Sequence, residues 1–257
     1  MKKSTFFKSA SLALACAAAT AAFSGCGSKN YAENNTAFFI GASGPLTGSA
    51  ASYGIAVQRG AELAVEEINA KNEDGMRFTF EIKDDKASAA DVPTNFAALY
   101  EKGMQLSLGA VTSGACLSFK GLAAEKNLFT LCPSATADDV TKDADTVFQM
   151  CFSDSNQGSV AAQQYFNTDA VPAGTKLGIL YCSTDAYSKG IYDTFKAALD
   201  TSKFAEVAET SFRNDASGNP PTDMNSQVET LKNCSYFFMP VYYTPAVTFM
   251  LAAKGKI

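Results

Sequence analysis

The chain has 257 residues, 47% of them hydrophobic, which is enough to bury the core of one large domain or of two small ones. Its formal net charge is −5 and no basic cluster follows Lys8, so we expect no nucleic-acid partner, because such binding relies on clustered Lys and Arg. Histidine is absent, which excludes Ser-His-Asp and Cys-His catalysis and nearly every common zinc or iron site, so we expect neither an enzyme nor a bound metal or cofactor.

The N-terminal residues have the pattern of an export signal. Three lysines precede an apolar, alanine-rich run over residues 9–23, which is shorter than the about 20 residues that a spanning helix needs. The small residues Ser24 and Gly25 before Cys26 resemble a bacterial lipobox, although Phe23 departs from the usual leucine. We expect a signal peptide over 1–25, lipidation of Cys26 and a linker over 26–36; plain secretion with cleavage elsewhere is the alternative. Cleavage after residue 25 removes three lysines and no acids, which lowers the formal charge from −5 to −8.

From residue 37 onward, short β-rich runs alternate with stretches that carry apolar residues at helical spacing. The pattern predicts strands over 37–42, 77–83, 105–110, 128–131, 147–151, 176–181, 206–211 and 236–239. It predicts helices over 52–70, 89–102, 115–126, 156–166, 187–199, 223–231 and 245–253. Strands separated by helices need right-handed crossovers, so the fold class is α/β, with mostly parallel sheets and helices on both faces.

A short polar segment near residues 153–156 separates the fifth predicted strand from the next helix. We therefore expect two lobes, the first over 37–153 and the second over 154–257. The chain stops directly after a helix, where the βα alternation calls for another strand, so we expect the second lobe to be incomplete.

The cysteines do not form a recognisable framework. Cys16 leaves with the signal and Cys26 is the expected lipid site. None of the other five has C-x-x-C spacing, and five cannot all pair. We therefore favour the interpretation that they are small buried hydrophobic residues over that of a disulfide scaffold. These five are Cys116, Cys132, Cys151, Cys182 and Cys234.

Ligands of open parallel sheets lie beyond the carboxyl ends of the strands, so the turns that leave each strand are informative. The first turn, 41–48, is rich in glycine and is followed by Tyr53, an aromatic edge for a cleft. It matches no nucleotide-binding pattern. In the second turn, Ser113 stands where a helix begins, and free N–H groups and a hydroxyl suit a carboxylate there. The alternative is that Ser113 only caps the helix.

The third turn follows a predicted strand with Ser134, Ala135 and Thr136, whose carbonyls and Thr hydroxyl suit an ammonium beside that carboxylate; helix capping is again the alternative. Tyr187 and Tyr242 follow strands of the second lobe and are expected to face the first lobe across a cleft. Ordinary packing is the alternative for each tyrosine.

Several ordered motifs resemble one known family. They are SGPLTGSAASYG at 43–54, GAELAVEEINA at 60–70, PSATA at 133–137, DSNQG at 154–158 and LGILY at 177–181. Over 38–253 the chain resembles the type I periplasmic binding proteins, similar to the leucine/isoleucine/valine-binding protein of branched-chain amino-acid transporters. The resemblance implies the two-lobed periplasmic-binding-protein type I fold, closure of two lobes over an amino acid, and docking on an ABC transporter permease.

The resemblance also implies roles for single residues. Ser113 and Thr136 would hold the ligand carboxylate and ammonium together with the backbone of Ser134, and the three tyrosines would wall the pocket. A branched-chain amino acid is the first expectation, and the location is exported, in the periplasm or at the cell surface. Two departures stand out. A cysteine pair of some relatives is not matched, since Lys86, Ala87 and Thr112 occupy those neighbourhoods, and the family's acidic ligand residue falls beyond Ile257. A sensory ligand-binding module is the alternative function.

Overall fold

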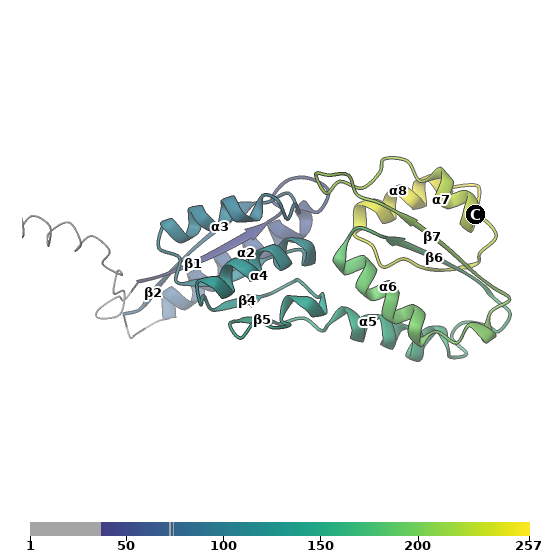
Figure 1. Cartoon of the computed structure of the whole chain (residues 1–257), viewed down its shortest axis with the longest axis horizontal. Helices are drawn as coiled ribbons and strands as arrows, with labels where there is room; N and C mark the ends of the chain where they lie inside the picture. The colour runs from purple at the N-terminus through teal and green to yellow at the C-terminus, as the bar shows by residue number, and fades with distance from the viewer. Residues whose placement is uncertain (1–36, 72, 74) are drawn as a thin grey trace, which may run out of the picture. The chain divides into compact units, whose positions relative to one another are not determined.

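Strands and helices alternate along the described part of the chain as the sequence predicts (Figure 1). The computed structural model describes residues 37–71, 73 and 75–257. The predicted signal peptide at 1–25, the linker at 26–36 and the lipidation of Cys26 lie outside the described residues. The first half comprises β1 (Ala37–Gly44), α2 (Ala51–Lys71), β2 (Arg77–Asp84), α3 (Val92–Glu101), β3 (Leu106–Ala110), α4 (Ser113–Glu125), β4 (Thr130–Cys132), η1 (Asp138–Val140) and β5 (Val147–Gln149).

The second half begins at a helix and continues with the same alternation. It comprises α5 (Asp154–Ala161), the π-helical turn η2 (Ala162–Phe166), β6 (Lys176–Cys182), α6 (Ala186–Ala198), η3 (Thr201–Lys203), β7 (Glu206–Phe212), α7 (Asn225–Leu231), β8 (Tyr236–Phe238) and α8 (Tyr243–Ala253). Each of the eight predicted strands and seven predicted helices therefore has a counterpart in the described residues.

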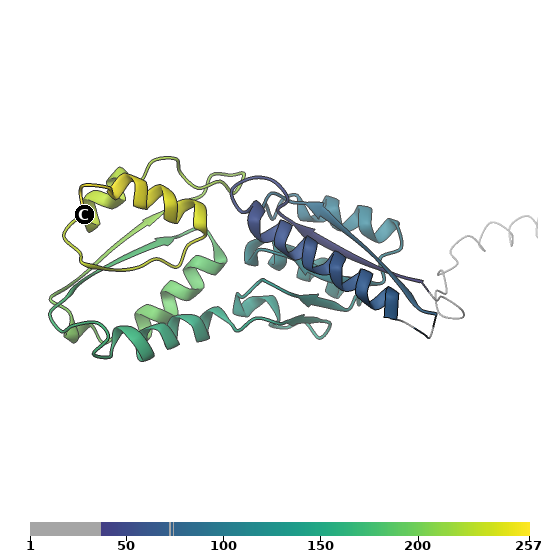
Figure 2. The ribbon, with the colours of Figure 1, turned by 180° about the vertical axis from the view of Figure 1, so that it is seen from behind.

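The strands form two parallel sheets. The first has the order β2-β1-β3-β4-β5 and the second the order β7-β6-β8. Helix α2 covers one face of the first sheet, and α3 and α4 cover the other (Figures 1 and 2). In the second sheet, α5 and α6 lie on the face opposite α7 and α8 (Figure 1). The predicted α/β class, with parallel sheets flanked by helices, is confirmed.

Buried side chains alternate along the strands, as two covered faces require. In β6, Leu177 and Ile179 pack into one apolar cluster, whereas Leu180 packs into a second cluster on the opposite face. Phe195 of α6 stacks on Phe238 of β8 in the first of these clusters, with ring centroids 3.7 Å apart. The near-continuous apolar run of β6 therefore belongs to a strand buried on both faces.

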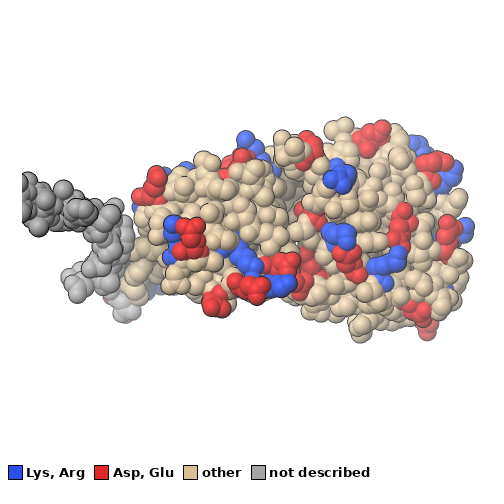
Figure 3. Space-filling view, viewed as in Figure 1, with Lys and Arg blue, Asp and Glu red and all other residues tan. Residues whose placement is uncertain are grey.

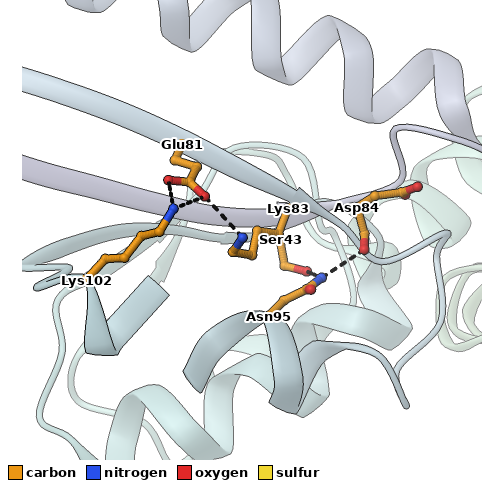
Figure 4. Close-up of polar contacts among 6 residues, drawn as sticks. All are labelled: Ser43, Glu81, Lys83, Asp84, Asn95 and Lys102. Atoms are coloured by element: carbon orange, nitrogen blue, oxygen red, sulfur yellow. Dashed lines mark hydrogen bonds and ion pairs between the residues drawn. The ribbon is translucent and has the colours of Figure 1, made fainter. Parts of the chain in front are cut away.

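A polar network fixes the carboxyl end of β1 (Figure 4). Asn95 Nδ2 donates to Ser43 Oγ at 3.1 Å and to the Asp84 carbonyl at 3.0 Å. Ser43 Oγ in turn donates to Asp85 Oδ2 at 2.8 Å. The Asp84 carboxylate accepts from the Thr47 hydroxyl at 2.5 Å, so the turn between β1 and α2 is tied to the end of β2. This network positions the start of α2.

Surface charges are paired and mixed in sign. Glu81 on β2 lies between Lys102 at 2.8 Å and Lys83 at 3.1 Å, and the hydrogen bond from Lys102 is the chief reason that the pKa of Glu81 is lowered (Figure 4). On the face shown in Figure 3, Lys and Arg side chains are interspersed with Asp and Glu rather than gathered into a patch. Exposed pairs of this kind contribute at most about 1 kcal/mol each.

Element ends differ from prediction by a few residues, with local causes. Helix α3 begins at Val92 rather than 89, since residues 89–91 form a turn, Asp91 is the N-cap and a proline stands in the first turn of the helix. Helix α5 begins two residues early, because the Ser153 side chain accepts a hydrogen bond from the Asn156 N–H and caps it. Within the described stretches, no helix has both the length and the apolar character to cross a bilayer.

Candidate functional site

The seven residues predicted to form the site line one cavity of about 190 Å³. The cavity lies at the carboxyl ends of first-sheet strands and against helix starts of the second half, where a parallel α/β fold places ligands. Residues from the first half are Tyr53, Ser113, Ser134, Ala135 and Thr136, and those from the second are Tyr187 and Tyr242. The geometry thus brings together every residue of the predicted set.

Ser113 is the best-defined polar group of the cavity. Its side chain is buried, and its Oγ accepts hydrogen bonds from the N–H groups of Thr136 and Ala137, both at 3.2 Å. A serine hydroxyl has two lone pairs and one proton, so both acceptor positions are occupied and only donation remains. None of the described residues accepts a hydrogen bond from Ser113 Oγ. The group is therefore a donor without an acceptor, which suits an anionic or carbonyl oxygen.

The alternative that Ser113 is a helix cap is wrong. Thr112 is the N-cap residue of α4, and Ser113 is the first residue of the helix. The Ser113 side chain bonds to the loop after β4 rather than to its own helix. The first turn of α4 also has free N–H groups, and its end carries a partial positive charge. Both favour an anion at the place where the Ser113 hydroxyl can donate.

The loop after β4 is held in place by hydrogen bonds within the protein. The Thr136 carbonyl accepts from the Asp154 N–H at 2.9 Å, and the Ala135 carbonyl accepts from Gln149 Nε2 at 2.9 Å. The Thr136 side chain is buried at the cavity wall. These two carbonyls already have protein donors, which differs from the expectation that they are free for an ammonium. The second lone pair of each carbonyl remains, and the Thr136 hydroxyl, which interacts with the Asp154 carboxylate, can still accept a hydrogen bond.

Three tyrosines form a continuous aromatic wall. The Tyr53 and Tyr242 ring centroids lie 5.4 Å apart in an edge arrangement, and Tyr187 and Tyr242 stack at 5.0 Å. Burial raises the pKa of Tyr187 to about 12, and it raises the pKa values of Tyr53 and Tyr242 as well. The three phenols are therefore neutral at physiological pH and contribute hydrogen bonds and shape rather than charge.

Two carboxylates lie close to Tyr187 and Tyr242. Asp154, the first residue of α5, is fully buried, and neither of its oxygens has a hydrogen-bond partner of good geometry. Its pKa is raised to about 6, chiefly by burial and to a smaller extent by the like charges of Asp138 and Asp185. Burial also raises the pKa of Asp185, which caps α6 by accepting from the Ser188 N–H at 2.9 Å. Both carboxylates raise the pKa of Tyr187, so a cation is favoured on this side of the cavity.

Five lining residues escaped the sequence analysis. The Thr112 hydroxyl is buried without any partner, and Gln157 comes from the second turn of α5. The only signal for them was their position next to predicted site residues or strand ends. The five are Val111, Thr112, Cys151, Phe152 and Gln157. The described residues contain no group of three or more Cys, Asp or Glu side chains that is suited to a metal ion.

Comparison with protein families and curated proteins finds a consistent set of relatives. The profile of the family described as periplasmic binding protein matches residues 37–254. The Leu/Ile/Val-binding protein BraC3 of Rhizobium johnstonii is 34% identical over 170 residues, which cover 65% of this chain and 45% of that protein. The Leu/Ile/Val-binding protein homolog 3 of Brucella melitensis is 30% identical over 198 residues, covering 76% and 52%. The chain spans about half the length of these curated relatives.

Among solved structures, the fold resembles the branched-chain amino acid transporter substrate-binding protein LivJ of Streptococcus pneumoniae, determined with isoleucine. The TM-score is 0.74 at 28% sequence identity, and the match covers 85% of this chain and 61% of the other.

Proposed function

Because the chain belongs to the periplasmic binding protein family, we propose that it captures an amino acid outside the cytoplasm and delivers it to an ABC transporter. A branched-chain amino acid is the proposed ligand. The printed names of the curated relatives and the isoleucine in the structural neighbour support this class of ligand. The role is binding and release without catalysis.

The observation that carries the proposal is the unsatisfied donor of Ser113. Both lone pairs of its hydroxyl are engaged by the loop after β4, so its proton is directed to a ligand acceptor at the start of α4. A carboxylate there gains a charge-assisted hydrogen bond and the positive end of the helix. The ammonium of the same molecule is favoured near Thr136, because the Asp154 carboxylate interacts with the Thr136 side chain. An α-amino acid carries both of these charges on one carbon atom and its substituents.

The size and the walls of the cavity agree with a small, partly apolar molecule. A cavity of roughly 150 Å³ is enough for benzene, so 190 Å³ leaves room for a molecule of about nine non-hydrogen atoms, such as leucine or isoleucine. The aromatic wall and Val111 supply apolar surface for the side chain.

We further propose that lobes over 37–153 and 154–257 close on the ligand. Thr244 of α8 donates to the Ser49 carbonyl at 2.7 Å, and the Tyr53–Tyr242 contact joins the same two parts of the chain. Hinge closure of this kind needs a ligand that touches both lobes. The cavity is lined by residues from both, so a ligand in it would do so. Export by the signal at 1–25 and lipid anchoring at Cys26 complete the proposal and place the protein beside a membrane permease.

The test is calorimetric titration of the full-length protein with isoleucine, with its carboxamide and with the acid that lacks the amino group. We expect isoleucine to bind, and both analogues to bind at least tenfold more weakly, because each lacks one charge. Ser113→Ala should weaken isoleucine binding by about 1 to 3 kcal/mol through the lost charge-assisted hydrogen bond.

Ser118→Ala is the matched control, since Ser118 lies in the same helix but does not line the cavity. Its affinity should equal that of the unsubstituted protein. Unchanged isoleucine affinity in Ser113→Ala would remove Ser113 from the site. Equal affinities for isoleucine and its carboxamide would show that the N-terminus of α4 does not bind a ligand carboxylate.

A further inference from the structure

Two buried thiols meet directly beneath the proposed carboxylate site. Cys116 lies in the second turn of α4 and Cys132 is the last residue of β4, and both are fully buried. Their Sγ atoms are 2.9 Å apart. The sulfur atoms of a disulfide lie about 2.0 Å apart, so bond formation needs them to approach by less than about 1 Å.

The backbone around the two sulfurs leaves room only for them. Gly109 of β3 has a φ of 65°, and a Cβ atom there would lie 2.7 Å from Cys132 Sγ and 3.6 Å from Cys116 Sγ. A side chain at this position would strain the backbone and displace Cys132. Glycine therefore keeps open the space that the pair occupies.

The remaining described cysteines are engaged differently. Cys151 Sγ donates to the Pro133 carbonyl at 3.1 Å, and Cys182 Sγ lies 3.5 Å from the Thr184 hydroxyl. Cys234 is buried under β6 and α7. Among the five cysteines that the structure describes, only Cys116 and Cys132 bring their sulfurs into contact.

We propose that Cys116 and Cys132 form a disulfide in the exported protein. The proposal shares with the proposed function the export that family membership implies, but it does not depend on amino-acid binding. Disulfides form and persist in extracytoplasmic compartments, whereas the cytosol keeps thiols reduced. The pair differs from a scaffold of several bridges, because it leaves three cysteines as thiols.

The chemistry is thiol–disulfide exchange with an oxidised dithiol oxidoreductase. The Cys116 thiolate attacks one sulfur of the oxidant disulfide and forms a mixed disulfide, and the other oxidant sulfur leaves as a thiolate. The Cys132 thiolate then attacks Cys116 Sγ and releases the second oxidant thiolate. Two protein thiols lose two protons and two electrons, and the oxidant disulfide becomes a dithiol. Because both sulfurs are buried once α4 packs, the exchange takes place while the exported chain folds.

Once the two sulfurs lie side by side, Cys116 ionises more readily than Cys132. The hydrogen bond with Cys132 is the chief reason that the pKa of the Cys116 thiol is lowered, whereas the same contact raises the pKa of Cys132.

The bond would join the two segments that make the carboxylate site. Cys116 follows Ser113 on α4, and Cys132 precedes Ser134 in the loop after β4. The hydrogen bonds from Thr136 and Ala137 to Ser113 already hold these segments together in the thiol form. We therefore expect the disulfide to change stability strongly and ligand affinity by less than about threefold.

The experiment uses full-length protein exported to the periplasm and purified without reductant. The protein is denatured, alkylated with iodoacetamide before and after reduction, and weighed intact, and the peptides are mapped. We expect Cys116 and Cys132 to be alkylated only after reduction and to appear as one cross-linked peptide pair. Alkylation of both thiols without reduction, or a cross-link to a different cysteine, would overturn the proposal.

Thermal unfolding provides a second measurement. Reductant should lower the Tm by about 5 to 10 °C, as expected for a bridge that closes a short loop in a domain of this size. Cys116→Ala should abolish this response, whereas the control Cys182→Ala should keep it. If either variant does not fold, the mass measurement on the unsubstituted protein still decides. Free thiols with intact isoleucine binding would refute this proposal alone, and a disulfide without amino-acid binding would refute only the proposed function.

Discussion

Asp154 gives the sharpest test of the electrostatics at the site. Its carboxyl group is fully buried at the start of α5 without a hydrogen-bond partner of good geometry, and the Thr136 hydroxyl offsets only part of the cost of burial. The neighbouring Asp138 and Asp185 add like charge rather than a counter-charge. We expect Asp154→Asn, which keeps the shape and removes the charge, to stabilise the protein near neutral pH.

The sign and size follow from the two pKa values of Asp154. The pKa is about 6 in the folded protein and near its ordinary value of 3.8 in the unfolded chain. Well below pH 3.8 the carboxyl is neutral in both states and does not lower the free energy of unfolding. As pH rises from 3.8 to about 6 only the unfolded state loses the proton, so stability falls; above 6 the cost is constant. At about 1.4 kcal/mol for each pH unit, the interval corresponds to about 3 kcal/mol.

The assay is urea unfolding of both proteins between pH 4 and pH 8. We expect Asp154→Asn to be more stable by about 1 to 3 kcal/mol at pH 8, since some favourable interaction with the α5 N-terminus is also lost, and the difference to shrink towards pH 4. Taking the difference between proteins cancels Asp85, whose pKa burial also raises to about 6. A difference that does not change with pH would refute the reasoning.

Asp138→Asn is the control with the opposite sign. Burial alone would raise the pKa of Asp138, but hydrogen bonds from the Ser155 hydroxyl at 2.6 Å and N–H at 3.0 Å outweigh it and lower the pKa. Its ionised form therefore stabilises the folded protein above the ordinary pKa, and this contribution is lost as pH falls. Asp138→Asn should destabilise the protein at pH 8.

Two further predictions concern packing. Thr112→Val removes a buried hydroxyl that has no partner and caps nothing, so it should stabilise the ligand-free protein by about 1 kcal/mol, measured by urea unfolding; a loss of stability would contradict this. Gly158→Ala would place a Cβ atom 2.1 Å from Thr194 Oγ1, where α5 meets α6, and should destabilise by at least about 2 kcal/mol. The control is Gly60→Ala in α2, where an added Cβ atom meets nothing within 4 Å, so it should stabilise the protein by about 0.5 to 1 kcal/mol. Equal effects of the two substitutions would contradict the close approach of α5 and α6 at Gly158.

The alternation of strands and helices was predictable because local patterns encode it. Each buried strand such as β6 reads as a short apolar run, and each helix has apolar residues at three- and four-residue spacing. The order of the strands was not predicted, because pairing is decided by contacts between residues far apart in the chain. The helix ends were also less certain, since caps such as Ser153 compete with neighbouring polar residues.

The candidate site was predictable to the extent that it follows from topology. Tyr53, Ser113 and Thr136 follow strand ends, so a parallel sheet brings them to one edge. Phe152 and Gln157 were missed, because residue 151 was predicted to end a strand, whereas β5 ends at Gln149 and the following residues turn into the cavity wall. The acceptor role of the Ser113 hydroxyl could not be read from sequence, since it depends on two N–H groups from another loop.

The aromatic wall also provides a built-in optical signal. The sequence contains ten tyrosines and no tryptophan, so the intrinsic emission of the protein comes from tyrosine alone. Tyr53, Tyr187 and Tyr242 touch one another across the two halves of the chain. A tryptophan introduced at position 53 would be the sole indole in the molecule, placed where the halves meet. Its emission would report the proposed closure of the two lobes in real time without an attached dye.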